Sequence, residues 1–170
     1  IRRATQQMSQ LIEDLLAYSR LERRKLQASP VSPAALVTAL LAEYAEEIRR
    51  RDVAVTVNLP EVTLRIDPEG LAMVLRNLLD NALKFTQTAA APQIEIGGTL
   101  ATLGSGTVCR LWVRDNGVGF EMKYHDRIFE IFQRLHREEE YPGTGVGLAI
   151  VRKALERMGG RVWANSEPGV

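Results

Sequence analysis

The feature that most constrains the fold is the interleaving of two hydrophobic periods along one chain. Between residues 68 and 85, apolar side chains recur every three to four positions, the spacing of an amphipathic helix. Over residues 53–59 and 107–115 they alternate with other side chains, which is typical of half-buried strands. Because the two patterns are interspersed, the sequence predicts a mixed α/β domain.

Prolines, glycines and capping residues set the expected boundaries of the elements. Ser32 before Pro33 is a helix start, and Gly159-Gly160 is a helix end. The expected helices span residues 33–51, 68–85, 122–132 and 148–158. The expected strands span residues 53–59, 62–66, 93–96, 107–115 and 161–165. The expected loops are residues 86–92, without visible chemistry, the glycine-rich segment 97–106, and the polar, glycine-rich segment 136–147.

A separate long helix is expected to precede this domain, over residues 3–27. It carries an apolar stripe made of Met8, Leu11, Ile12, Leu15, Leu16 and Tyr18. The sequence Ser29-Pro-Val-Ser-Pro33 ends the helix, so we expect a linker and a domain boundary near residue 30. Two interpretations stay open: the stripe packs on its own domain, or it needs a partner from a bundle or a second chain.

Composition excludes several classes of protein. The chain has 22 Lys and Arg against 21 Asp and Glu, so no extended surface for nucleic acid is expected. No apolar run approaches the roughly 18–20 residues that span a bilayer, so this segment is expected to make no direct membrane contact. Cys109 is the single cysteine, so no intrachain disulfide can form and a reducing compartment is expected. Because Ile1 is not a start methionine, we expect a fragment of a longer protein.

Polar side chains lie along one side of the expected helix 68–85. Asn81 lies at the edge of its apolar stripe, and Asn77 and Lys84 flank that stripe. An amide can ligate a metal or bond a phosphate oxygen, and a lysine can neutralise phosphate charge. An ordinary amphipathic helix with a polar flank has the same pattern, so this pattern alone does not distinguish a binding site from a solvated helix face.

Two glycine-containing segments are further candidates. The expected strand 107–115 carries an apolar face that ends at Asp115, and a buried carboxylate needs hydrogen-bond donors. Gly117 and Gly119 follow and permit close approach of a flat ligand, although a plain strand-ending turn looks the same. Residues 143–147 run into a helix whose free N–H groups favour phosphate, but their spacing matches neither a Rossmann turn nor a P-loop. They form another kind of phosphate loop, or a hinge.

In order and spacing, these motifs resemble the catalytic, ATP-binding domain of two-component sensor histidine kinases. The family's N box is matched by residues 77–86, its first glycine box by 115–120, its F box by 127–134 and its second glycine box by 143–148. The sequence of residues 129–147 is most similar to that of phytochrome-like sensor kinases. Residues 8–20 resemble the second helix of the dimerisation and phosphotransfer hairpin. The resemblance therefore implies part of that hairpin in residues 1–29 and the catalytic domain in residues 30–170.

The resemblance implies a two-layer α/β sandwich, shared with gyrase and mismatch-repair ATPases and preceded here by one long helix. It also implies transfer of the ATP γ-phosphoryl group to a histidine on an upstream helix, for relay to an aspartate of a response regulator. That histidine is not in this chain, because His125 and His136 are expected to be surface or lid residues. The alternatives are a non-catalytic pseudokinase or scaffold module of the same superfamily, and a serine kinase that acts on anti-sigma partners.

Implied partners are the protein's own dimerisation hairpin, a second subunit and the receiver domain of a response regulator. The implied cofactors are ATP or ADP and Mg²⁺, and the implied location is the cytoplasm, even if the full-length protein carries a membrane anchor.

The resemblance also assigns roles to single residues. Asp115 would accept a hydrogen bond from the adenine amine, and Gly117 and Gly119 would let the backbone approach the base. Asn81 would ligate Mg²⁺, with Asn77 in support. The remaining nucleotide contacts would come from Lys84 at the phosphates and Phe85 near the adenine.

A lid, residues 134–144, would close over the nucleotide. Phe129, Phe132 and Arg134 would anchor and charge it, although plain core packing explains either phenylalanine equally well. The phosphates would be met by a glycine loop and the start of the following helix, with the residues Gly143, Thr144, Gly145, Val146, Gly147 and Leu148.

Overall fold

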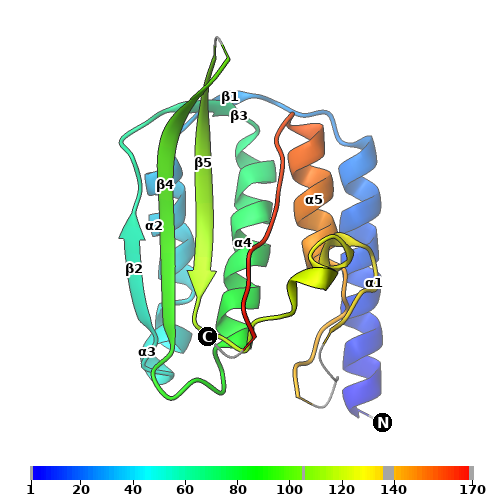
Figure 1. Ribbon diagram of the computed structural model, residues 1–170. Helices are drawn as coiled ribbons and strands as arrows, with labels where there is room; N and C mark the ends of the chain where they lie inside the picture. The colour runs from blue at the N-terminus through cyan, green and yellow to red at the C-terminus, as the bar shows by residue number, and fades with distance from the viewer. Residues whose placement is uncertain (1, 105, 136–139, 169–170) are drawn as a thin grey trace.

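The computed structural model describes residues 2–104, 106–135 and 140–168. Its elements form two layers, with helices packed on one face of a mixed sheet (Figure 1). The helices are α1 (Arg2–Arg23), α2 (Pro33–Glu43), α3 (Ala45–Arg50), α4 (Pro68–Phe85) and α5 (Gly147–Arg157), with two 3₁₀ turns, η1 (Met122–Tyr124) and η2 (Arg127–Phe129). The strands are β1 (Ser29–Val31), β2 (Ala54–Asn58), β3 (Leu64–Ile66), β4 (Gln93–Leu103) and β5 (Gly106–Asp115). The predicted two-layer α/β fold is confirmed.

The main sheet has the strand order β2-β4-β5. Strand β2 runs parallel to β4, and β4 runs antiparallel to β5, with Ile94 opposite Asp115 and Ile96 opposite Val113. A second, two-stranded sheet pairs β1 with β3. The segment predicted to be a linker therefore contains a short strand, because its backbone pairs with the strand that leads into α4.

Two apolar clusters place α4 at the centre of the molecule. One face of α4 packs against α2 and the sheet, with Leu75, Leu79 and Ile94 at most 4% exposed. A different face of α4 packs against α5 in a second cluster, which contains Val74 of α4 and Leu21 of α1. Helix α4 thus separates the sheet from the pair α1–α5, as Figure 1 shows.

Helix α1 uses only part of its apolar stripe on its own domain. Leu21 is buried, and Leu11 and Tyr18 pack against the cluster around α5. The stripe residues on the other side are exposed: Met8, Ile12, Leu15 and Leu16. Both interpretations of this helix therefore keep support, since one face is packed and the other lacks apolar cover.

The predicted helix 122–132 is wrong. The chain forms two separate 3₁₀ turns there, and Phe132 has φ +64°, which an α-helix does not allow. The physical cause is a distant partner, because the Phe132 N–H donates to the Gly145 carbonyl at 2.9 Å. Periodicity along the chain carries no information about such a contact.

The predicted glycine-rich loop 97–106 is also largely wrong, because β4 continues to Leu103. A Cβ on Gly97 would lie 2.3 Å from the Trp112 ring, and one on Gly98 would lie 2.8 Å from Leu111. These glycines make room for side chains of β5 rather than a turn.

The structure differs from the expected elements in smaller ways as well. The helix expected over residues 33–51 is divided at Tyr44, and residues 161–165 form no strand. That last segment still lies near β5, where the Arg110 guanidinium lies 5.2 Å from the Trp163 ring. His136 lies outside the described residues. No helix in the described part of the chain combines the length and the apolarity needed to cross a bilayer.

Gly97→Ala is expected to destabilise the fold by about 1–3 kcal/mol, the usual effect of overpacking. Its methyl group would collide with Trp112, whose indole is fixed by a hydrogen bond from Nε1 to Glu95 at 2.9 Å. Urea unfolding measures the effect. Gly106→Ala is the matched control, because the nearest atom to its Cβ is 3.8 Å away. Equal stability of the two variants would contradict the role of Gly97.

Candidate nucleotide-binding site

Helix α4 carries most of the candidate site, and its ends are well defined. The Asp67 side chain accepts a hydrogen bond from the Gly70 N–H at 2.7 Å, and Pro68 occupies the first turn. Burial of one face fixes the rotation of the helix. The half-buried polar side is thereby set, and it carries Asn77, Asn81 and Lys84.

The start of α5 approaches α4 at Asn77. A Cβ on Gly147 would lie only 2.9 Å from the Asn77 Oδ1 atom. The Asn77 Nδ2 donates to the Met73 carbonyl at 2.9 Å, which turns the amide oxygen toward α5. Thus the N-terminus of α5, with its free N–H groups, lies against an amide oxygen of α4.

Lys84 lies beside the glycine loop, residues 143–147. Its Nζ atom is 3.2 Å from the position of a Cβ on Gly143 and 4.4 Å from the Phe85 ring centroid. Burial lowers the pKa of Lys84, and the Arg134 guanidinium lowers it further, while Asp80 opposes them. Two cations near one half-buried loop favour an anion between them.

Asp115 ends β5 close to the C-terminus of α4, where the loop that follows it meets Phe85. Burial raises the pKa of Asp115, and the Gly117 N–H, which donates to its Oδ1 at 2.9 Å, partly offsets this. A Cβ on Gly117 would lie 2.6 Å from the Phe85 carbonyl, so only glycine allows this loop to approach α4 so closely. A half-buried carboxylate in this position can accept a further N–H donor such as an exocyclic amine.

Gly119 has φ +62°, and a Cβ there would lie 2.3 Å from the Glu167 carbonyl. The Phe120 N–H donates to Ser166 Oγ at 2.9 Å. The first glycine box is therefore pressed between α4 and the C-terminal segment.

The segment before the lid is held mainly by its backbone. Phe129 is buried, which fits an anchor of the lid and plain core packing equally, whereas the Phe132 side chain is 54% exposed. The hydrogen bond between the Phe132 N–H and the Gly145 carbonyl ties this segment to the glycine loop. Gly145 itself has φ +72°, a conformation that favours glycine. Val146 is fully buried, and Leu148 packs against the α5 cluster.

Several contacts of the lid were not predicted from the sequence. Tyr141 is 8% exposed, and its ring centroid lies 5.4 Å from that of Phe85. Its hydroxyl group shares a hydrogen bond with Thr88 at 2.9 Å, and Gln87 donates to the Glu140 carbonyl at 2.7 Å. The loop 86–92 therefore holds residues 140 and 141 of the predicted lid. The one indication of these contacts in the sequence is the aromatic Tyr141 within the polar segment 136–147.

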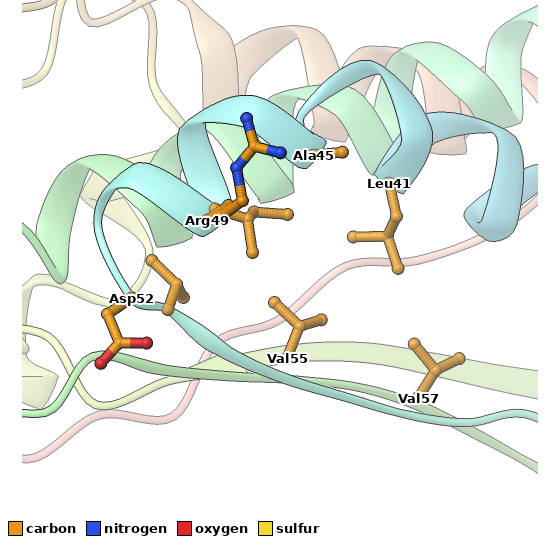
Figure 2. A pocket seen from close by; sticks show the side chains of 8 residues that line it. Leu41, Ala45, Arg49, Asp52, Val55 and Val57 are labelled. Carbon is orange, nitrogen blue, oxygen red and sulfur yellow. The ribbon is translucent and has the colours of Figure 1, made fainter.

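Two hollows of the surface lie elsewhere and contain none of the predicted site residues. Figure 2 shows one of about 380 Å³ between α2–α3 and β2, lined by apolar side chains with Arg49 and Asp52. The other, of about 500 Å³, lies between residues 51–54 and 86–93. In the described residues, no cluster of three or more His, Cys, Asp or Glu side chains could hold a metal ion. The polar groups of the candidate site are the Asp115 carboxylate, the amides of Asn77 and Asn81, and the cations Lys84 and Arg134.

The groups assembled along the C-terminal half of α4 are chemically suited to a ligand with both a base and phosphates. Residues 66–170 match the sequence model of the "Histidine kinase-, DNA gyrase B-, and HSP90-like ATPase" family, and the chain belongs to that family. The predicted family is confirmed.

Individual relatives narrow the class. The chain is 36% identical over 168 residues to Cyanobacterial phytochrome A of Nostoc sp., covering 95% of this chain and 20% of that protein. It is 34% identical over 169 residues to the Methanogenesis regulatory histidine kinase FilI of Methanothrix harundinacea, covering 99% and 18%. The full-length structure of ShkA in complex with AMPPNP matches with a TM-score of 0.76 and 27% identity, over 94% of this chain and 33% of that one. The chain is thus an ATPase domain of the histidine kinase type, and it spans about a fifth of the length of these two relatives.

Asp115→Asn is expected to stabilise the folded protein at neutral pH. Because the folded-state pKa of Asp115 is raised, the ionised carboxylate weakens the fold as the pH rises through that pKa. The amide removes this loss and still accepts from Gly117. Thermal denaturation should show a higher Tm for the variant at pH 7, and no difference near about pH 3, where the carboxyl is protonated. Asp126→Asn is the control, because Asp126 is 87% exposed. A lower Tm for Asp115→Asn at pH 7 would contradict this account.

Proposed function

We propose that this chain is the nucleotide-binding part of a sensor histidine kinase. It binds ATP with Mg²⁺ and presents the γ-phosphoryl group to a histidine on an upstream helix, for relay to a response regulator aspartate. One observation carries the proposal: α4 touches the glycine loop through Asn77 and Lys84, and the loop after Asp115 through the Phe85 carbonyl. A ligand with a base and a phosphate chain can therefore lie along a single helix.

The base would bind at the Asp115 end. The carboxylate would accept a hydrogen bond from the adenine amine. Burial favours adenine over a base without an amine in that position, because a carboxylate left unpaired there is costly. Phe85 and Tyr141, whose rings already pack together, would form the apolar side of this pocket. The close approach at Gly117 leaves no room for a side chain between base and helix.

The phosphates would bind at the glycine loop. Backbone N–H groups at the start of α5, together with Lys84 and Arg134, would offset the phosphate charge. Phosphoryl transfer depends mainly on such positioning and charge stabilisation. Bound Mg²⁺ would bridge phosphate oxygens and neutralise their charge. The half-buried amide oxygens of Asn81 and Asn77 are suitable ligands for it, and Asn77 already directs its oxygen toward α5.

We also propose that residues 1–29 belong to a dimerisation hairpin and residues 30–170 to the catalytic domain. The exposed stripe residues of α1 are the support: Met8, Ile12, Leu15 and Leu16. The missing helix of the hairpin and a second subunit would cover them. A histidine kinase named ThkA has been solved in complex with a response regulator, and it shares this fold with a TM-score of 0.73 at 20% identity. By analogy, the receiver domain of a response regulator is the proposed acceptor. The cytoplasm is the proposed location, since a chain with a single cysteine suits a reducing compartment.

The activity test supplies the missing acceptor. The chain is incubated with MgATP and a separate hairpin that carries the phosphoacceptor histidine, and acid-labile phosphate on the hairpin is measured. We expect transfer by the wild type, and no stable phosphohistidine at His125 or His136 of the chain alone. Asn81→Asp and Asp115→Asn should lose transfer and nucleotide binding, with the circular dichroism spectrum unchanged. Asp126→Asn should behave as wild type.

A pseudokinase would bind nucleotide without transferring phosphate. Binding without transfer would therefore favour that alternative, and wild-type binding by both site variants would contradict the assigned roles.

The exposed stripe of α1 leads to a separate prediction. Ile12→Ser with Leu16→Ser should reduce self-association of the chain in sedimentation experiments, because it removes apolar surface worth about 25 cal/mol per Å². Thr38→Ser on α2, away from this stripe, is the control. Unchanged association would place the contact elsewhere.

A further inference from the structure

A hydrogen bond joins α1 to the glycine loop across 130 positions of the sequence. The Thr144 hydroxyl group donates to the Asp14 Oδ2 atom. The same hydroxyl oxygen accepts the Val146 N–H at 3.4 Å, at the residue that caps α5. A continuous set of hydrogen bonds therefore leads from the N-terminus of α5 through Thr144 to a carboxylate on α1.

The packing of α1 on α5 determines where Asp14 lies. Asp14 lies three residues after Leu11 and four before Tyr18, on the helix face that packs against the α5 cluster. An ion pair from Lys153 to Glu22 at 2.7 Å adds a second link between the two helices. The Gln10 Nε2 atom donates to Asp14 Oδ1 at 2.9 Å and so holds the carboxylate with its other oxygen toward Thr144. Figure 1 shows α1 alongside α5 in this arrangement.

We propose that Asp14 is a positioning residue of the nucleotide site: it holds the Thr144 hydroxyl away from the phosphates and lowers nucleotide affinity while α1 is docked on α5. The inference rests on the proposed function, since it takes the glycine loop as the phosphate site.

The number of protons on the Thr144 hydroxyl group explains why Asp14 should lower nucleotide affinity rather than raise it. A threonine hydroxyl group carries a single proton, so Thr144 cannot donate to Asp14 and to a phosphate oxygen at the same time. If the Thr144 hydroxyl group donates to a phosphate oxygen of the nucleotide, its hydrogen bond to Asp14 is lost. If the bond persists, a carboxylate charge stays close to the polyphosphate in a half-buried place, which is repulsive. Both outcomes weaken binding. By linkage, bound nucleotide must then weaken the docking of α1 on α5 by the same factor.

Calorimetry with ADP and ATP on the 170-residue chain tests the proposal. Asp14→Ala should bind at least about fivefold more tightly than wild type, the lower end of ordinary coupling between sites. Asp14→Asn removes the charge but keeps an acceptor, so its affinity should lie between the two. Glu13→Ala removes a neighbouring exposed carboxylate of α1 and should leave the affinity unchanged. A purely structural Asp14 would lower the Tm when replaced and would not tighten binding.

Variants of Thr144 separate the hydroxyl effect from the charge effect. In a Thr144→Ser background the hydroxyl remains, so Asp14→Ala should still tighten binding. In a Thr144→Val background the same substitution should tighten it much less. Unchanged or weaker binding by Asp14→Ala, while wild type binds and Asp115→Asn does not, overturns this inference alone. Absence of nucleotide binding by every form, wild type included, overturns the proposed function as well.

Discussion

The candidate site depends on two close approaches of the backbone to one helix. Near the middle of α4, Gly147 brings the start of α5 against Asn77, and at the C-terminus of α4, Gly117 brings a loop against the Phe85 carbonyl. A side chain at either glycine would collide with α4 at 2.9 Å or less. Without both contacts, the N–H groups and the carboxylate that the site needs would be too far from the polar side of the helix.

These contacts hold charged groups in half-buried places. Burial raises the pKa of Asp115 and lowers that of Lys84, so the charged form of each is disfavoured when the site is empty. The same groups gain partners when a base and phosphates are bound. The charged groups of the empty site therefore lower the stability of the folded state, and a bound ligand offsets this loss, as is common where function needs buried polar groups.

Much of the fold and of the site could be predicted from the sequence. The stripe of α4 and the alternation of β5 are local patterns, and they correctly placed Asn77, Lys84 and Asp115 on their elements. The failures involve contacts between distant segments. Phe132 adopts φ +64° where its N–H reaches Gly145, and Gly97 lies within a strand where it makes room for Trp112. The lid contacts of Tyr141 and the bond from Thr144 to Asp14 were missed for the same reason.

The most direct test maps the two ends of the site separately by NMR on the ¹⁵N-labelled chain. Adenosine should shift the amide signals of Asp115 and Gly117, pyrophosphate those of residues 143–147, and ADP both sets at once, since α4 joins the two ends. Shifts confined to the hollow around Val55 and Val57, or the same set of shifts for adenosine and pyrophosphate, would contradict a site built along this helix.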